Sequence, residues 1–317
     1  MNKIFFALVF LFANSLFSQQ RRFAKYNNAA ENIKNNASLN VVDVKENIYM
    51  IEGAVGNIGV YVAEEGVIMI DNSLEIIEEL ITATVKKISS KPIKYIINTH
   101  HHYDHADGNR AYGIRKIPII AHHNVRNRQK KGTKAYGGIY SILENFYVPA
   151  HEENGLPTIT FKEKLSLHEG SEEISIFYFG NGHTDGDAII KFEKSNVIHT
   201  GDSFVLYGLP YIDITNGGSI EGFIYNLDKI ASVCDEETII IPGHGGLSNL
   251  EQLNKLSQEL KEYYKKTLEG YDDGLSVSEI SDSIITELGK VSGFGEPVTV
   301  KHNFIKSILL ENNIVVD

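Results

Sequence analysis

A cluster of histidine and aspartate directly after a buried strand is the feature that most limits how this 317-residue sequence can fold. The apolar segment Ile93–Asn98 predicts the strand, and the next residues read Thr-His-His-His-Tyr-Asp-His. Alternate side chains of an extended chain share one face, and the following turn can add a fourth side chain to that group. The expected group is His100, His102, Asp104 and His105. The remaining histidine, His101, is expected to point away, into a supporting position or into solvent.

Three further polar residues stand where predicted strands end, each beside glycine. They are His183, Asp202 and His244. Glycine lets the backbone turn sharply and approach a ligand closely, so these loops are suited to form the rim of one site. With the first motif they supply five histidines and two aspartates, which are ligands typical of zinc and related metals.

The composition narrows the kind of metal site. The single cysteine, Cys234, excludes a disulfide framework within this sequence and any site built from several cysteines, and we interpret it as a small buried residue. The balance of 30 basic against 41 acidic residues argues against nucleic acid as a partner. The sequence therefore predicts a site of nitrogen and oxygen ligands for a small-molecule substrate.

The pattern along the chain mixes short β-branched runs with amphipathic helical runs, and no repeat of 20 to 50 residues is visible. One half, about residues 40–150, is followed by a half with a similar list of strands and helices, about 160–317. This order predicts an α/β fold, a four-layer α/β/β/α sandwich. The predicted strands are Val41–Val44, Ile48–Ile51, Ile58–Ala63, Val67–Ile70, Ile93–Asn98, Pro118–Ala121, Ile174–Phe179, Ala188–Phe192, Val197–Thr200 and Thr238–Ile241. The predicted helices lie near residues 76–88, 124–131, 219–233, 250–268 and 276–288.

The N-terminal residues have the form of an export signal. A lysine precedes a short apolar run, and small and polar residues lead to a plausible cleavage point after Ser18. The run is too short to span a bilayer comfortably, so no stable membrane anchor is expected after cleavage. We predict a signal peptide at 1–18, a mobile segment at 19–40 and one domain at 41–317, with C-terminal helices from about 247. The expected location is the periplasm.

The order and spacing of the His and Asp motifs resemble the metallo-β-lactamase-fold hydrolase superfamily from about Val41 to Gly246. The resemblance implies the four-layer sandwich and a site for two zinc ions between the two sheets. It implies that His100, His102 and His183 bind the first metal and that Asp104, His105 and His244 bind the second, with Asp202 bridging both. Asp71, after the strand Val67–Ile70, resembles the supporting acid of the family; an Asp-Asn turn is the alternative interpretation.

Two zinc ions that share a hydroxide can polarise a carbonyl while the hydroxide attacks it. Our mechanistic hypothesis is therefore hydrolysis by a metal-bound hydroxide, with Asp104 as the catalytic residue that orients it and carries its proton. No serine or cysteine nucleophile is required.

Several substrates are compatible with these motifs. Cysteine-type β-lactamases carry a bridging cysteine and a lysine three residues later, whereas this sequence has Asp202 and Val205. The motifs most resemble exported metallo-hydrolases related to quinoprotein-relay and sulfur-oxidation proteins. The leading hypothesis is β-lactamase-like opening of a cyclic amide or a lactone. The alternatives are a thioester hydrolase that resembles glyoxalase II and an iron-dependent persulfide dioxygenase, for which iron would replace zinc.

Four weaker signals remain in the sequence. Tyr207 and Tyr211 follow the bridging aspartate and could either donate a hydrogen bond to an oxyanion or pack in the core. The basic run at 126–131 predicts a solvated helix face rather than a phosphate site. His122 and His123 are interpreted as structural, and residues 131–149 as a candidate flap. The sequence does not indicate an oligomeric state.

Overall fold

The structure is a computed structural model that describes residues 31–135, 146–284, 288 and 297–314. The predicted signal peptide and the centre of the candidate flap lie outside these residues. Residues 31–36 are helical, and the first strand begins at Asn40, so the described part of the N-terminal segment leads directly into the domain. No helix among the described residues combines the length and apolarity needed to cross a membrane.

The N-terminal half forms a seven-stranded mixed sheet in the order β1-β2-β3-β4-β5-β6-β9. Strands β1 to β4 are antiparallel neighbours, and β4, β5, β6 and β9 run parallel to one another. Parallel neighbours need crossover connections, and these place helices on the outer face of the sheet. The strands are β1 (Asn40–Lys45), β2 (Ile48–Glu52), β3 (Ile58–Val62), β4 (Val67–Ile70), β5 (Ile93–Ile97), β6 (Ile119–His122) and β9 (Ile159–Phe161).

The C-terminal half forms a five-stranded sheet in the order β10-β11-β12-β13-β14, in which only the β13–β14 pair is parallel. Its strands are β10 (Lys164–Glu169), β11 (Glu172–Phe177), β12 (Ile189–Phe192), β13 (Val197–Gly201) and β14 (Ile239–Pro242). A separate hairpin pairs β7 (Thr133–Ala135) with β8 (Phe146–Val148).

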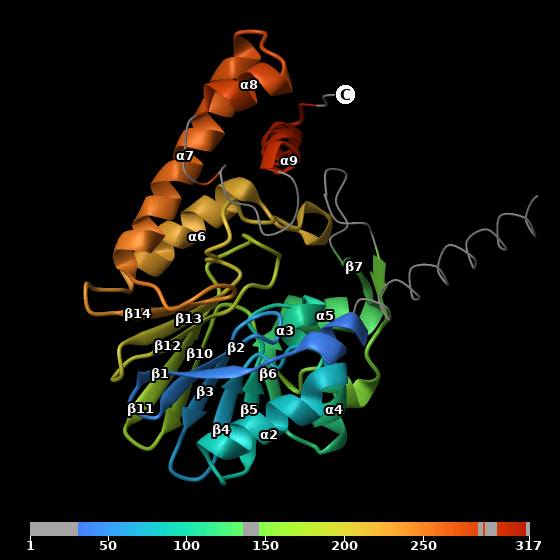
Figure 1. Cartoon of the computed structure of the whole chain (residues 1–317), viewed down its shortest axis with the longest axis vertical. Helices are drawn as coiled ribbons and strands as arrows, with labels where there is room; N and C mark the ends of the chain where they lie inside the picture. The colour runs from blue at the N-terminus through green and yellow to red at the C-terminus, as the bar shows by residue number, and fades with distance from the viewer. Residues whose placement is uncertain (1–30, 136–145, 285–287, 289–296, 315–317) are drawn as a thin grey trace, which may run out of the picture.

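Helices cover the outer face of each sheet (Figure 1). The described helices are η1 (Glu75–Ile77), α2 (Glu78–Ile88), α3 (Tyr103–Ala106), α4 (Asn109–Ile114), α5 (His123–Lys131), η2 (Glu153–Gly155), η3 (Ile214–Asn216), α6 (Ile220–Ser232), α7 (Leu250–Asp272), α8 (Val277–Ser283) and α9 (Pro297–Glu311). Helix α2 packs on the first sheet, and α6 and α7 pack on the second.

Three apolar clusters correspond to the three interfaces between the four layers. Within β4, Ile68 and Ile70 face the second sheet, whereas Val67 and Met69 face α2, because successive strand residues point to opposite faces. Ile174, on β11, belongs to the same cluster as the first pair. The predicted four-layer α/β/β/α sandwich is therefore confirmed.

Some element boundaries differ from the sequence prediction. The predicted helix at 276–288 ends at Ser283, although its start carries the capping box formed by Ser276 and Glu279. The predicted helix at 250–268 continues to Asp272. Strands β9 and β10 were not predicted. The edge strand β10 has only exposed and half-buried residues and lacks a continuous apolar run.

Phe192 tests the contact between the two sheets. Its side chain is fully buried on β12, and its ring lies 5.3 Å from that of Tyr61 on β3. Phe192→Ala should lower the free energy of unfolding by about 3–5 kcal/mol, because it leaves a cavity between packed sheets. Urea unfolding measures the loss. Ile114→Ala, at a position that is 67% exposed, is the control and should change stability by less than about 0.5 kcal/mol. Equal losses would contradict this packing.

Candidate metal centre

The first motif leaves the end of β5 and changes direction at a short helix. His100 and His102 lie in the loop, and α3 begins directly after His102. Asp104 and His105 lie within α3, so this one-turn helix, rather than a continued strand, brings the second pair of side chains to the site. All four side chains are buried.

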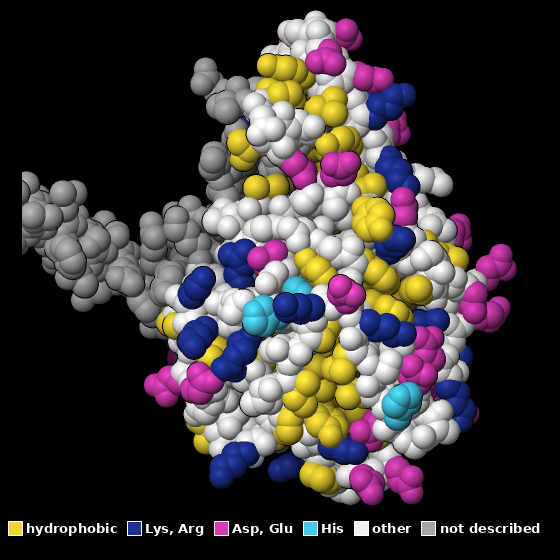
Figure 2. Space-filling view, turned by 180° about the vertical axis from the view of Figure 1, so that it is seen from behind, with side chains coloured by type: hydrophobic (Ala, Val, Ile, Leu, Met, Phe, Trp, Pro, Cys, Tyr) yellow, Lys and Arg dark blue, Asp and Glu magenta, His cyan; other side chains and the backbone are white. Residues whose placement is uncertain are grey.

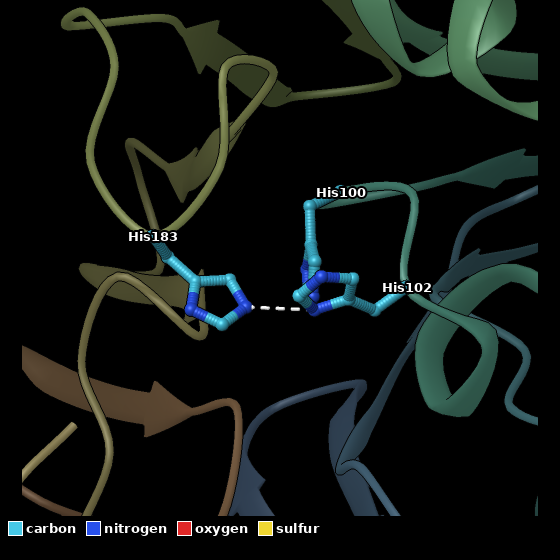
Figure 3. Close-up of side chains that lie close together, drawn as sticks. All are labelled: His100, His102 and His183. Atoms are coloured by element: carbon cyan, nitrogen blue, oxygen red, sulfur yellow. Dashed lines mark hydrogen bonds between the residues drawn. The ribbon is translucent and has the colours of Figure 1, made fainter. Parts of the chain in front are cut away.

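Three histidines from both halves of the chain converge in Figure 3. His100 and His102 come from the loop after β5, and His183 comes from the loop between β11 and β12. Their facing ring nitrogens all lie within 4.8 Å of one another, which is compatible with shared coordination of one ion. The structure thus brings together the three residues expected to bind the first metal, here called the first triad.

In each ring of the first triad, one nitrogen faces the other rings (the inner nitrogen) and one faces away from them (the outer nitrogen). The outer nitrogen forms a hydrogen bond that orients the ring. His183 Nδ1 lies 2.7 Å from the carbonyl oxygen of Tyr211, and His102 Nε2 lies 2.8 Å from Oδ2 of Asp213. A carbonyl and a carboxylate only accept hydrogen bonds, so each outer nitrogen must donate and the inner nitrogen carries a lone pair. This is the arrangement in which imidazole binds metal.

His100 follows the same rule through a threonine. Thr99 Oγ1 donates to Oδ2 of Asp71 at 2.7 Å and can therefore accept from His100 Nδ1, which lies 3.0 Å away. His100 Nε2 is buried and has no hydrogen-bond partner among the described residues. An inward lone pair without a partner is costly unless a cation or a proton lies nearby.

The inward nitrogens of His102 and His183 provide a direct test of whether a metal fits. His183 Nε2 and His102 Nδ1 lie 2.9 Å apart, although the outer hydrogen bonds assign a lone pair to both. Two lone pairs at this distance repel, and either a metal ion or a proton shared by the two rings would remove the repulsion. The donor set and this contact therefore fit a divalent ion such as zinc.

A second cluster adjoins the first. Asp104, His105 and His244 offer ligand atoms within 4.8 Å of one another, and we call them the second triad. Asp202 contacts both groups: its Oδ1 lies 3.1 Å from His105 Nε2, and its Oδ2 lies 3.6 Å from His183 Nε2 and 3.4 Å from His244 Nε2. The carboxylate thus contacts histidines of both triads, and its role as a bridging ligand stays a prediction.

Burial and charge act differently on the histidines of the site. In the first triad, burial lowers the pKa of His102, but its hydrogen bond to Asp213 outweighs burial and raises that pKa, whereas the other two pKa values are lowered. Burial lowers the pKa of His100 well below its ordinary value and lowers that of His183 to about 4, so both imidazoles are neutral at pH 7. Burial acts the same way on the second triad, but Asp202 and Asp104 outweigh it. The pKa of His244 rises to about 9, and that of His105 rises well above its ordinary value.

The two carboxylates of the site are ionised. Burial raises the pKa of Asp202, but the charges of His244 and His105 outweigh it and hold that pKa well below its usual range. The same balance, with His105 first among the opposing charges, lowers the pKa of Asp104. Both side chains are therefore available as anionic ligands.

Asp71 acts as a support of both triads rather than as a turn residue alone. Its carboxylate accepts hydrogen bonds from the Thr99 backbone N–H at 2.7 Å and from His105 Nδ1 at 2.8 Å. Its backbone has φ 64°, a left-handed conformation that is costly for a non-glycine residue and is often found at functional sites. The interpretation as a supporting acid accounts for these contacts.

Asp71→Ala should free the ring of His105 and weaken metal binding at the second triad about 10- to 100-fold, as is typical for loss of a residue that orients a ligand. Competition with a chromophoric chelator measures the effect. Asp43→Ala, at an exposed position on β1, is the control. Unchanged affinity in Asp71→Ala would contradict the supporting role.

The His244 loop is fixed to the opposite half by Asn57, which the sequence did not single out. Its side-chain amide donates to the carbonyl oxygens of Pro242 and Gly245 at 2.9 and 2.7 Å. Gly243 is required beside the bridging residue, because a Cβ there would lie 1.9 Å from Oδ1 of Asp202. The glycine beside His244 was visible in the sequence, whereas the contact of Asn57 with this loop was not.

Asp213 is a second residue that sequence reasoning missed. It lies before η3 with no glycine motif or strand end to mark it, yet it is fully buried and contacts His102. His101 is also buried, so the expectation that it might face solvent is wrong. Its ring lies 4.7 Å from that of His102, and both its nitrogens lack hydrogen-bond partners among the described residues. The supporting alternative is consistent with this position.

The two tyrosines lie beside the metal-binding side chains. The ring of Tyr207 is 5.6 Å from that of His244, and the ring of Tyr211 is 6.0 Å from that of His183. The hydroxyl of Tyr207 accepts a hydrogen bond from the Tyr211 backbone N–H at 3.3 Å. Burial and then the charge of Asp202 raise the pKa of Tyr207 well above its usual value, so its hydroxyl stays protonated.

The remaining signals lie outside the two triads. His122 bonds the carbonyl of Lys162 and stacks on Tyr178, which is a structural role. Cys234 is half-buried against the core of the second half, and burial raises its pKa to about 11. Residues 136–145 of the candidate flap lie outside the described residues.

The fold is a sandwich in which both halves of the chain contribute candidate metal ligands to one site. The sequence matches the model of the Metallo-beta-lactamase superfamily over residues 51–244. The chain therefore belongs to this superfamily, whose members usually bind metal ions, often zinc, and its membership indicates a metal-dependent hydrolase.

Known relatives extend the comparison. Metallo-beta-lactamase IND-1 of Chryseobacterium indologenes is 27% identical over 205 residues, which cover 61% of this chain and 76% of that protein. A metallo-beta-lactamase structure from Pontibacter korlensis has a TM-score of 0.57 at 15% identity and covers 71% of this chain and 99% of its own. The sec-alkylsulfatase Pisa1 from Pseudomonas sp. has a TM-score of 0.62 at 14% identity and covers 84% of this chain and 50% of its own. The two structural likenesses concern the fold.

Proposed function

We propose that this protein is an exported hydrolase with two zinc ions that opens a cyclic amide or a lactone. The observation that carries the proposal is the pair of adjacent triads joined by Asp202, with inward lone pairs that fit metal ions. The similarity to a protein named metallo-beta-lactamase supports amide chemistry. The export signal in the sequence supports a location outside the cytoplasm.

The first triad and Asp202 would hold one ion, and the second triad and Asp202 the other. Two zinc ions bound there would supply Lewis acidity and lower the pKa of a water molecule to about 7. Asp104 is the residue placed to take a proton from that water, because its Oδ1 is buried and has no hydrogen-bond partner among the described residues. Ionised Asp104 can act as a base. The contacts of its Oδ2 with His105 and His244 fix the orientation of the carboxylate.

Tyr207 is placed to donate a hydrogen bond to a substrate oxygen. Its hydroxyl oxygen accepts the Tyr211 backbone N–H, and this contact does not use the hydroxyl proton. Its raised pKa keeps that proton in place at neutral pH. We propose that it stabilises negative charge that develops on the substrate carbonyl.

A thioester hydrolase is the second candidate, and the residue at the bridging position favours it. Asp202 stands where cysteine-type β-lactamases carry cysteine, and Val205 stands where they carry a lysine for the carboxylate of the drug. A persulfide dioxygenase would use one iron and fewer ligands. The convergence of all seven candidate ligands argues for two metals instead.

Metal analysis combined with a substrate panel tests these alternatives. The purified protein, loaded with zinc, is assayed with a chromogenic cephalosporin, an aliphatic lactone and a glutathione thioester. Two zinc ions per chain and turnover of the cephalosporin or the lactone are expected. Turnover of the thioester alone would move the assignment to the second candidate. One iron per chain with oxygen uptake on a persulfide would overturn the hydrolase.

A further inference from the structure

The last turn of α5 is connected to the first triad by a continuous series of hydrogen bonds. Arg128 Nη1 donates to Oδ1 of Asn216 at 3.0 Å. Asn216 Nδ2 donates to Oδ2 of Asp213 at 2.6 Å, and the same oxygen accepts from His102 Nε2 at 2.8 Å. We propose that Arg128 is a positioning residue which, through Asn216 and Asp213, fixes the ring of His102 with Nδ1 directed at His183. The inference rests on the proposed metal centre.

The chemistry of the two ends sets the direction of this series. A guanidinium group only donates and a carboxylate only accepts. The amide of Asn216 must therefore place its oxygen toward Arg128 and its nitrogen toward Asp213. If the amide were flipped, its NH2 group would face the donors of Arg128 and its oxygen would face the acceptor oxygen of Asp213. Asp213 is thus left to accept from His102, which keeps the proton on Nε2 and the lone pair on Nδ1.

Arg128 also holds the loop that carries His183. Its Nε and Nη2 bind the two carboxylate oxygens of Asp185 at 3.1 and 2.6 Å, a two-point contact that fixes orientation as well as distance. Asp185 follows His183 by two residues, and the Asn216 carbonyl accepts the backbone N–H of Asp185 at 3.3 Å. One arginine from the first half of the chain therefore contacts both loops of the second half that border the first triad.

The turn after η3 is packed against this arginine. Gly217 has φ 80°, and a Cβ there would lie 2.8 Å from Cβ of Asp185 and 3.2 Å from Nη2 of Arg128. At the other end of η3, Asp213 donates its backbone N–H to the carbonyl of His183 at 2.9 Å. A shift of Arg128 is therefore transmitted to both His102 and His183 rather than absorbed by loose packing.

The series runs from the surface to the interior. The side chain of Arg128 is 27% exposed, whereas Asn216 is 4% exposed and Asp213 is fully buried. A cavity of about 300 Å³ adjoins the outer end and is lined in part by Asn124, Lys131 and Asp185. Figure 2 shows Lys and Arg side chains gathered on one flank of the back face, the side on which Figure 1 places α5.

Arg126 provides a matched control on the same helix. Its side chain is 26% exposed, it forms an ion pair with Glu153, and it donates to the carbonyl of Pro157 at 2.7 Å. Among the described residues, its hydrogen bonds and ion pair go to Glu153 and Pro157 and not to the loops of the two triads. Arg126→Met and Arg128→Met therefore each remove one positive charge from a similarly exposed position. Only Arg128→Met removes the connection to His102.

The test measures metal binding rather than the rate of the reaction. Zinc affinity of the tighter site is measured by chelator competition, and the electronic spectrum of the cobalt-substituted protein reports the ligand geometry. Arg128→Met should weaken this site about tenfold, at the low end for residues that orient a ligand, and should alter the cobalt spectrum. Arg126→Met should leave both as in the unaltered protein.

Asn216→Leu keeps the proposal testable if Arg128→Met folds poorly. It breaks the same series while leaving the Arg128–Asp185 pair in place, and it should give a similar loss of affinity. In the double variant the two losses should not add, because both break one series. Additive losses, or an Arg128→Met protein that matches Arg126→Met in both readouts, would overturn the proposal.

These outcomes separate the two proposals. If the unaltered protein binds neither zinc nor cobalt, the proposed metal centre fails. If it binds both metals and Arg128→Met is indistinguishable from the control, only the role of Arg128 fails.

Discussion

His183→Ala should reduce hydrolysis more than about 100-fold, beyond the ~10- to 100-fold loss typical of residues that merely orient a ligand. The reason is that His183 supplies an inward lone pair of the first triad and also lies 3.6 Å from the bridging carboxylate of Asp202. We expect the variant to bind one metal ion less per chain. Metal analysis after gel filtration, together with the rate on the preferred substrate, measures both effects.

His151→Ala is the matched control for this prediction. His151 is also a buried histidine, with a pKa lowered to about 4 by burial, but it bonds the carbonyl of Gly155 away from the triads. It should keep both metals and most of the activity. A His183→Ala protein with full metal content and full rate would show that the triads are not the catalytic centre.

Lowering the pH from 8 to 6 should release the metal of the second triad before that of the first. A metal must displace protons from His244, whose pKa is raised to about 9, and from His105, whose pKa is raised well above its ordinary value. These protons are bound below their pKa, so the apparent affinity falls as the pH falls, by about tenfold per pH unit for each proton displaced.

The first triad has a smaller proton cost. His100 and His183 have lowered pKa values and are already neutral in this range; in His102 alone, burial lowers the pKa but the Asp213 hydrogen bond outweighs it. We expect about two metals per chain at pH 8 and about one at pH 6, with recovery when the pH and the metal are restored. Simultaneous release of both metals, or earlier loss from the first triad, would contradict the assignment.

The sequence predicted the two sheets because their buried strands are visible as apolar runs. Val67–Ile70 and Val197–Gly201 are buried along their whole length, and both were recognised. The edge strand Lys164–Glu169 was missed, since it is half exposed and carries no comparable signal. Helix α9 was also missed, because its sequence has only a weak separation of apolar and polar faces.

The sequence predicted the candidate ligands better than the residues that orient them, because the ligands form local patterns and the orienting residues do not. His100 to His105 and the glycine-flanked His183 form local patterns, so a reader of the sequence can find them. Asp213 and Asn57 act across 111 residues or more, on His102 and on the His244 loop, and no short pattern records such contacts. Residues that orient ligands from a distance become visible only when the chain is folded.

The two halves of the molecule meet at His105 and His244, whose Nε2 atoms lie 3.4 Å apart although 139 residues separate them in the sequence. With one cysteine, this sequence has no disulfide within itself to join such distant positions. Metal ions held by both halves would act as a reversible cross-link that closes a long loop, and closing a long loop restricts the unfolded chain more than the folded one. The centre that we propose for catalysis would then also determine how cooperatively the two sheets unfold. A chelator would lower the stability of the sandwich as well as abolish its activity.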